Sequence, residues 1–333
     1  MSDMTEDSQE NWEDERDKAA PPAPTAPRRR HGLRKFLLRL MAAGVVAGLL
    51  FYGGWFSHGR FQGSSTSVSP DQPDKLSAAL FPAGGVELDV HWGDVPARLV
   101  QEGVIDLEKL KVAAQSAGMP LTPDQVKVLT DGSDEPIRID ASNAYFALDV
   151  LWAVGLASKN AVLTQGPIAQ GGLAQAANYA STAGWTIGAK PGPQYLAALD
   201  LVPLTPEQQA VVEEVASNSW RPCCGNMTAF PDCNHGMAAL GLAELMASQG
   251  ASADDIFLAL KKISPFWFPT QYQYLAQYFQ GQGQAWEHVD ARLLMGKGYS
   301  SSSGFKQVYA QLQQQGALGA GSQGGGKASG CAS

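Results

Sequence analysis

Apolar positions recur along most of this chain at the three-to-four-residue spacing of amphipathic helices. Two segments, 142–158 and 237–250, are apolar on nearly every side, which predicts helices buried in the core. Further helices are expected at residues 96–118 with a break near Gly103, and at 171–181, 195–201, 206–219, 270–280 and 285–295. The pattern therefore predicts a mainly α fold, a single helical domain with minor short strands.

Two short stretches, 86–92 and 136–140, instead alternate between apolar and polar residues, and each predicts a short β-strand. Thr122 and Thr205 each stand directly before a proline and three residues before a glutamine, the pattern of a capping box at a helix start. Ser252 begins a similar capping-box pattern at the start of another expected helix. We interpret the two near-identical threonine starts as two uses of one capping pattern, with an internal repeat as the alternative.

The longest apolar run lies at residues 36–56 and holds a single charge, Arg39. As a helix it would span roughly 31 Å, enough for the core of a bilayer, and Arg39 lies near one end, from which it can reach the headgroups. Basic residues cluster at 28–35, ahead of the run, so the N-terminus is expected in the cytoplasm. The run predicts a single-pass transmembrane helix, with the main domain periplasmic or extracellular.

A cleaved signal peptide has the same order of charges, but no Ala-x-Ala cleavage pattern follows the run. A twin-arginine signal is a further alternative, although the arginines at 28–30 lack the expected close spacing to the apolar core. All three interpretations place residues 60–333 outside the cytoplasm. Around the helix at 36–56 we expect a disordered tail at 1–35, a flexible linker at 57–75, the helical domain at 76–312 and a Gly/Ser-rich flexible tail at 313–333.

Charge and motif content narrow the possible functions. The formal net charge is −8 with no basic face to offset it, which argues against a nucleic-acid partner. The chain has 4 cysteines, too few for a disulfide scaffold in a chain of 333 residues. No phosphate loop, Gly-x-Ser-x-Gly, His-Glu-x-x-His or haem-attachment motif occurs. The sequence leaves open whether the protein is an enzyme.

Three of the cysteines, Cys223, Cys224 and Cys233, stand close to His235. Three thiolates and an imidazole form a Cys₃His ligand set, which suits tetrahedral zinc, or copper(I) if fewer ligands engage. The spacing differs from that of zinc fingers. Because Cys233 and His235 are two positions apart, they converge only if the following helix starts at or after Asn234. We predict a site that binds or handles copper or zinc.

A thiol–disulfide function is the second interpretation of the same residues. Cys223 and Cys224 are adjacent, with Cα atoms about 3.8 Å apart, so a bond between them would be strained. Either can reach Cys233 across a loop of about ten residues. Asp232 or Asn234 is expected to cap the following helix, whose positive end then favours a Cys233 thiolate. In this interpretation Cys233 is the catalytic cysteine of a redox protein.

A structural or interaction domain with a stabilising disulfide is the third interpretation, and an oxidising compartment favours it. Cys331 lies in the Gly-rich tail, which could reach about 25 Å and bring this thiol back to the cluster. The expected partners are the membrane, through the helix at 36–56, and a protein that donates a metal ion or thiols.

Overall fold

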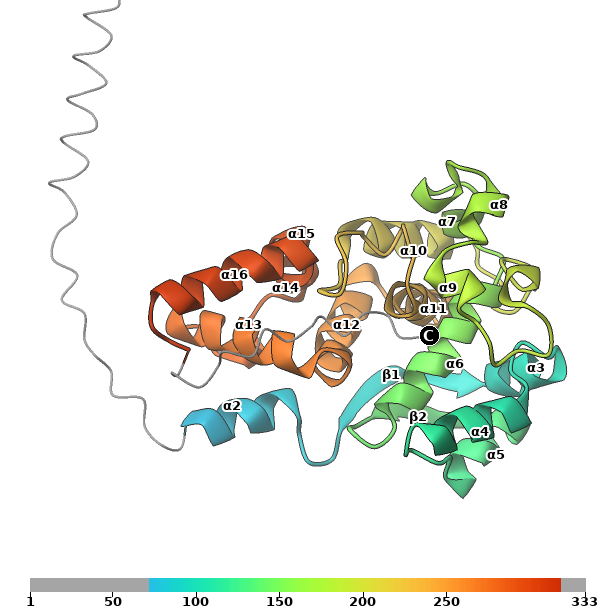
Figure 1. Cartoon of the computed structure of the whole chain (residues 1–333), viewed down its shortest axis with the longest axis horizontal. Helices are drawn as coiled ribbons and strands as arrows, with labels where there is room; N and C mark the ends of the chain where they lie inside the picture. The colour runs from blue at the N-terminus through green and yellow to red at the C-terminus, as the bar shows by residue number, and fades with distance from the viewer. Residues whose placement is uncertain (1–71, 319–333) are drawn as a thin grey trace, which may run out of the picture. The chain divides into compact units, whose positions relative to one another are not determined.

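The computed structural model describes residues 72–318 (Figure 1). The chain divides into two units, Met1–Ser67 and Val68–Ser333, and the described residues all belong to the second. The tail predicted at 1–35, the transmembrane helix predicted at 36–56 and Cys331 lie outside the described residues. Within residues 72–318, no helix combines the length and the apolar character needed to cross a bilayer.

Residues 72–318 fold mainly into helices, which confirms the predicted fold class. The α-helices are α2 (Gln72–Leu80), α3 (Val95–Gln101), α4 (Leu107–Ser116), α5 (Pro123–Asp131), α6 (Ala144–Ala157), α7 (Ala161–Thr164), α8 (Leu173–Ala176), α9 (Ala180–Ala183), α10 (Pro206–Asn218), α11 (Asn234–Ser248), α12 (Ala253–Trp267), α13 (Pro269–Gly281), α14 (Ala291–Met295), α15 (Lys297–Ser300) and α16 (Ser302–Gln314). Short 3₁₀ turns lie at Pro167–Ala169, Gly192–Gln194 and Trp286–His288. α2 begins within the stretch predicted as a linker, and α16 extends slightly past the predicted end of the domain.

The two predicted strands are present as one antiparallel pair, β1 (Val86–Gly93) and β2 (Ser133–Ile139). Val86 lies opposite Ile139, and the register shifts along the pair before it ends. Alternate residues of β1 are buried, as the alternating sequence pattern requires. The strands pack one face against the helices and expose the other.

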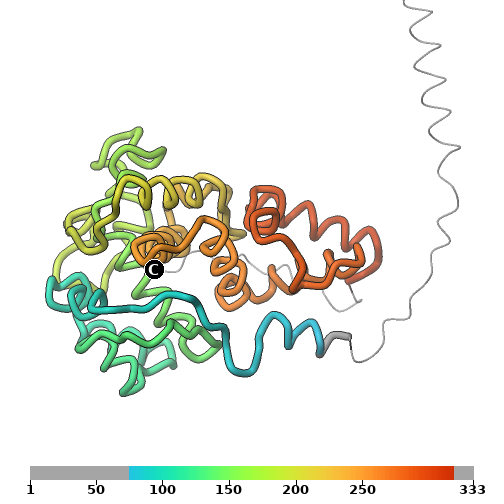
Figure 2. Tube along the Cα trace, turned by 180° about the vertical axis from the view of Figure 1, so that it is seen from behind, coloured from blue at the N-terminus to red at the C-terminus, as the bar shows by residue number. Residues whose placement is uncertain are grey.

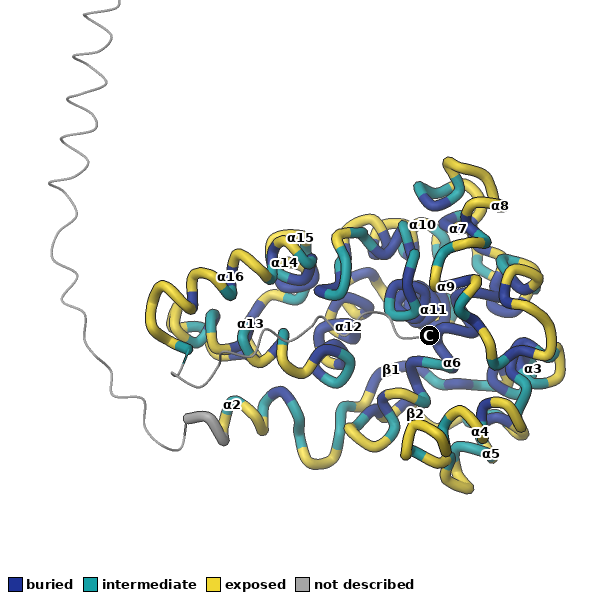
Figure 3. Tube along the Cα trace, viewed as in Figure 1, coloured by how far each residue is buried: buried dark blue, intermediate teal, exposed yellow. Residues whose placement is uncertain are grey.

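α6 and α11 form the centre of the described unit, and Figure 3 shows both largely buried. Their backbones touch at two glycines. A β-carbon at Gly155 would lie 2.9 Å from the backbone nitrogen of Gly241, and one at Gly241 would lie 2.7 Å from that of Gly155. Two helices that are apolar all round can therefore approach more closely than side chains would allow. α10 and α12 cover further sides of α11.

The remaining helices surround this centre. α13 and α16 lie side by side, as both the front and the back views show (Figures 1 and 2). The predicted capping boxes are confirmed at Thr122, Thr205 and Ser252, where the hydroxyl accepts from the backbone three residues on. These caps begin α5, α10 and α12.

Three of the predicted helices are wrong. One of them, 285–295, holds only the 3₁₀ turn at Trp286–His288 and the short helix α14, because the backbone is extended at Val289. Residues 195–201 are not helical: Ala197 has a φ of 50°, and Leu199 pairs with Ser158 as a parallel bridge. The Tyr195 hydroxyl donates to the carbonyl of Gly103 at 2.6 Å, which ties this segment to the turn that follows α3. Residues 171–181 hold only the short helices α8 and α9, since long-range contacts override the local helical pattern.

Candidate metal centre

Cys223, Cys224 and Cys233 lie on the loop that joins α10 to α11. This loop doubles back on itself, because the backbone N–H of Thr228 donates to the carbonyl of Ser219 at 2.8 Å and the two hydroxyls hydrogen-bond at 2.8 Å. Trp220 and Met227 pair as an isolated antiparallel bridge. The hairpin so formed carries Cys223 and Cys224 near its tip. A bond from the N–H of Ser302 to the carbonyl of Cys224, 2.9 Å, anchors the tip to α16.

α11 begins at Asn234, and Cys233 itself occupies the N-cap position. The expectation that Asp232 or Asn234 would be the cap is therefore wrong. Asp232 cannot cap because its carboxylate accepts from Arg221 and Asn226 instead. Cys233 has an extended backbone, with φ −129 and ψ 165, so it lies outside the regular helix. This meets the geometric condition under which Cys233 and His235 can converge.

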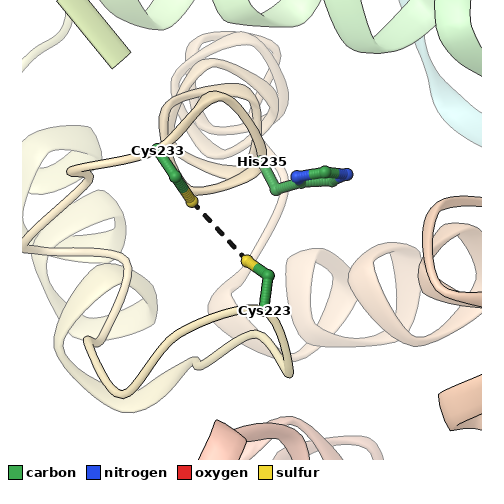
Figure 4. Close-up of side chains that lie close together, drawn as sticks. All are labelled: Cys223, Cys233 and His235. Carbon is green, nitrogen blue, oxygen red and sulfur yellow. Dashed lines mark hydrogen bonds between the residues drawn. The ribbon is translucent and has the colours of Figure 1, made fainter. Parts of the chain in front are cut away.

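The structure brings Cys223, Cys233 and His235 together, with one ligand atom from each residue within 4.8 Å of the others. The sulfur atoms of Cys223 and Cys233 lie 3.7 Å apart. A covalent disulfide would need about 2.05 Å. Figure 4 shows the two sulfurs pointing toward one another, with the imidazole of His235 beside them and one of its nitrogens on their side. Cys233 is buried, and the other two residues are half-buried.

Two aromatic residues at the end of α12 hold the imidazole of His235 in place. The ring centroid of Phe268 lies 4.4 Å from that of His235, and the ring of Trp267 lies edge-on at 6.0 Å. The Nδ1 atom of His235 is buried and has no hydrogen-bond partner among the described residues. Buried nitrogens are normally hydrogen-bonded, so an orphaned nitrogen in an imidazole that lies beside two cysteines needs an explanation.

Cys224 belongs to a second group, formed by its sulfur, Asp232 and Cys233, whose ligand atoms also lie within 4.8 Å of one another. The Asp232 carboxylate is already occupied by Arg221 at 2.5 Å and by Asn226 at 2.8 Å. A metal ion at this position would have to displace Arg221 or Asn226 from the carboxylate. Of the two groups, the one with His235 is the better cation site.

The pKa of Cys224 is also unfavourable for a metal ligand. A hydrogen bond with Cys223 lowers this pKa, but a hydrogen bond with Cys233 and burial outweigh it and raise the pKa of Cys224 to about 11. A thiol with a raised pKa gives up its proton to a metal ion less readily. The four residues predicted as one ligand set are thus divided between two groups that share Cys233.

Arg221 was not identified from the sequence, although it is the charged group closest to the cysteines. Its side chain is buried, and its Nε donates to the sulfur of Cys233 at 3.1 Å. Nη1 donates to the carbonyls of Asn226 and Met227, and Nη2 to the carbonyl of Phe230 and to Asp232. The position of Arg221, two residues before Cys223, was the only signal in the sequence. The guanidinium holds the loop in shape and presents a cation to Cys233.

The charge on Arg221 is secure despite its burial. Burial alone lowers the pKa of Arg221, but the negative charge of the cysteines, Cys233 first, outweighs burial and raises this pKa above its usual range. The same attraction acts in the other direction, because a guanidinium that donates to a sulfur favours the thiolate over the thiol. The arrangement therefore suits a deprotonated Cys233.

A small cavity adjoins the imidazole of His235 and is lined also by Arg221, Ser264 and Met295. It has room for about one water molecule. The site is thus a compact group of two sulfurs and an imidazole beside a buried cation, in a loop that the fold holds closed. In comparisons with known proteins, no family model, curated protein or solved structure matches this chain.

Proposed function

We propose that this protein binds a soft metal ion, zinc or copper, between Cys223, Cys233 and His235. One observation carries the proposal: the three ligand atoms lie within 4.8 Å of one another, and Nδ1 of His235 is buried with no hydrogen-bond partner among the described residues. A buried nitrogen in this state costs about 1–3 kcal/mol. A metal ion bound at Nδ1 removes that cost and uses the lone pair.

The distance between the sulfurs supports zinc as the first choice. With a bond of about 2.3 Å to each sulfur, tetrahedral zinc separates two sulfur ligands by roughly 3.8 Å. A linear site with bonds of the same length, as copper(I) adopts with two thiolates, would separate them by roughly 4.6 Å. The sulfurs of Cys223 and Cys233 lie 3.7 Å apart, close to the tetrahedral value.

The balance of charge leads to the same choice. Arg221 and Asp232 form an ion pair at 2.5 Å, so their charges cancel. Two thiolates, from Cys223 and Cys233, then require a divalent ion for the buried site to be neutral. A monovalent ion would leave one negative charge uncompensated in a site where burial makes charge costly. Three protein ligands also leave one position of a tetrahedron for water or for a ligand from a partner, which suits an ion that is handed on.

The location and partners are part of the proposal and rest on the sequence. The apolar run at 36–56, with basic residues ahead of it, supports a single-pass membrane protein whose metal-binding domain is extracytoplasmic. A metal or thiol donor protein would then be the partner. Protease protection of the domain in intact cells, with loss of protection when the outer barrier is opened, checks this placement in a cell with two membranes.

A thiol–disulfide function is the second candidate, favoured by the 3.7 Å between the sulfurs of Cys223 and Cys233. The Arg221 N–H on the Cys233 sulfur supports this too, since it stabilises a thiolate nucleophile. In this case Cys223, and not Cys224, would be the partner of Cys233. This candidate requires no ion and predicts a disulfide that cycles with a reductant.

Anaerobic purification of the full chain in detergent tests the proposal, with metal content and thiols measured on the same sample. We expect one zinc or copper ion per chain, and its loss in His235→Ala and in Cys233→Ser. Cobalt in place of zinc should show sulfur-to-cobalt charge-transfer absorption, which reports ligation directly. The exposed His288 offers a matched control, since His288→Ala should leave the ion in place.

The result that would overturn the proposal is a folded protein without a stoichiometric ion, or one in which His235→Ala retains the ion and the cobalt spectrum unchanged. Circular dichroism on each variant separates loss of the ion from loss of the fold. A metal-free protein with one reversible disulfide between Cys223 and Cys233 would establish the second candidate instead.

A further inference from the structure

The two sulfurs that would hold the ion are also placed to bond to each other. The Sγ atoms of Cys223 and Cys233 lie 3.7 Å apart, and a disulfide needs about 2.05 Å, so each sulfur has to move by less than about 1 Å. A thiolate that has become half of a disulfide no longer carries the charge that binds a metal ion. The ion and the disulfide are therefore alternative states of the same pair.

The surrounding fold accommodates this exchange without breaking a helix. Cys233 is the N-cap residue of α11, with an extended backbone, and Cys223 lies near the tip of the hairpin loop. Neither residue is inside a regular element. A disulfide between them closes a loop of about ten residues, a size that costs little to close.

Arg221 keeps the loop in place in both states. Its guanidinium donates to the carbonyls of Asn226, Met227 and Phe230 and to the carboxylate of Asp232, in addition to the sulfur of Cys233. When Cys233 loses its negative charge, four of these partners remain. The loop should thus keep its shape, and the imidazole of His235 should keep its contacts with Trp267 and Phe268 and be able to bind an ion again.

Cys224 is placed differently. Its sulfur lies on the side of Asp232, 3.9 Å from the carboxylate, and outside the group that contains His235. A bond between the adjacent residues Cys223 and Cys224 would be strained, because neighbouring Cα atoms are closer than disulfides prefer. The sulfur of Cys224 also lies within 4.8 Å of that of Cys233, but the sulfurs of Cys223 and Cys233 are only 3.7 Å apart and point toward one another, so we expect oxidation to join Cys223 to Cys233.

We propose that oxidation of the site by a peroxide joins Cys223 to Cys233 and releases the metal ion, so that the protein gives up its ion in response to oxidant. This inference rests on the proposed metal-binding function. One thiolate attacks a peroxide oxygen and becomes a sulfenic acid, and hydroxide leaves. The second thiolate attacks that sulfur, forms the S–S bond and displaces a second hydroxide, while the divalent ion departs hydrated.

The balance is complete for zinc and hydrogen peroxide. Two thiolates lose two electrons, the peroxide gains them, and two protons from solvent convert the two hydroxides to water. The products are one disulfide, one zinc ion and two water molecules. A thiol reductant reverses the change in the protein, and the orphaned Nδ1 of His235 favours the return of the ion.

The test uses the full chain in detergent, loaded with zinc and carrying Cys331→Ser to remove the thiol of the tail. Hydrogen peroxide is added in steps, released zinc is measured with a chromogenic chelator, and disulfides are mapped by mass spectrometry. We expect one zinc released for each Cys223–Cys233 disulfide formed, and rebinding of one zinc after reduction. Cys224→Ser should give the same stoichiometry.

Two results would overturn the inference: zinc retained after the Cys223–Cys233 disulfide has formed, or zinc released only with a disulfide to Cys224 or with sulfinic acid. These differ from failure of the proposed function, in which the reduced protein holds no zinc before any peroxide is added. Zinc that is bound at the start and resists oxidation would leave metal binding intact and remove only the redox control.

Discussion

Arg221 occupies the space that a side chain would need at Gly236. A β-carbon at Gly236 would lie 2.6 Å from Nη2 of Arg221 and 2.7 Å from its Nε, below the distance that real contacts allow. The first turn of α11 therefore has a glycine where the guanidinium passes. The same guanidinium reaches the sulfur of Cys233 at 3.1 Å, so a residue without a side chain shapes the candidate metal centre.

Gly236→Ala should displace Arg221 and loosen its hold on Cys233. We expect the free energy of unfolding to fall by about 1–3 kcal/mol, as for other substitutions that overpack a core. We also expect a loss of about 10–100-fold in zinc affinity, the range typical when a group that orients a ligand is disturbed. Urea denaturation and competition with a zinc chelator measure the two effects.

Gly225→Ala is the matched control for this change. Gly225 lies in the same loop, is exposed, and has open space where its β-carbon would be. Gly225→Ala should leave both the free energy of unfolding and the zinc affinity almost unchanged. Equal effects of the two substitutions would show that the contact between Gly236 and Arg221 is not what orders the site.

Arg221→Met should be among the most destabilising substitutions in the protein. It leaves the Asp232 carboxylate without its cation and three backbone carbonyls without their donor, and breaking a buried ion pair costs about 3–5 kcal/mol. Chemical denaturation of the metal-free protein measures this. Arg292→Met is the comparison, because Arg292 is likewise an ion-paired arginine, but its partners, Asp254 and Glu214, lie with it at the surface. It should cost less than about 1 kcal/mol. Similar losses in the two variants would refute the importance we assign to Arg221.

The crossing of α6 and α11 should tolerate no side chain at its centre. Gly155→Ala and Gly241→Ala each place a β-carbon against the backbone of the other helix, and we expect each to lower the free energy of unfolding by at least about 2 kcal/mol. Thermal and urea unfolding measure the loss of stability.

Gly281→Ala is the control, at the end of α13, where a β-carbon meets nothing. This substitution should be neutral or slightly stabilising. If neither Gly155→Ala nor Gly241→Ala lowered the free energy of unfolding, the close contact of α6 and α11 would not be important for stability.

The stability of the protein should depend on the protonation of Asp149 in α6. Burial disfavours the charged form and raises the pKa of Asp149 from 3.8 to about 7. Between about pH 4 and pH 7 the folded protein holds a proton that the unfolded chain has lost, so the free energy of unfolding falls as the pH rises through this window.

Asp149→Asn removes this dependence. The variant should gain little stability over the parent at pH 4 and less than about 4 kcal/mol at pH 8, because the Asp149 side chain is only half-buried and solvent screens part of the charge. Urea denaturation at both pH values, with a chelator present, measures the difference. Asp89→Asn serves as the control, since Asp89 is exposed on β1 and should change stability little at either pH. A gain of equal size at pH 4 and pH 8 would contradict the assignment to Asp149.

Local sequence patterns predicted helices correctly where residues within one or two turns determine them. The capping boxes at Thr122, Thr205 and Ser252 begin helices because a hydroxyl and a side chain three residues on satisfy backbone groups within one turn. The segments 142–158 and 237–250 became the buried helices α6 and α11, since residues apolar on every side have no stable place at a surface. The helix predicted at 195–201 is absent because Tyr195 hydrogen-bonds to Gly103, a residue distant in the sequence, and local periodicity does not show this contact.

By itself, the sequence determined that the chain is mainly helical, that three cysteines and a histidine stand within one short stretch, and where most helices begin. Only the tertiary structure decided that Cys223 and Cys233 meet beside His235, that Cys224 turns toward Asp232, and that Arg221 lies buried among them. The physical reason is that helix caps and periodicity depend on neighbours three or four residues away. The positions of a loop's side chains depend on which distant helices cover it, here α12 and α16.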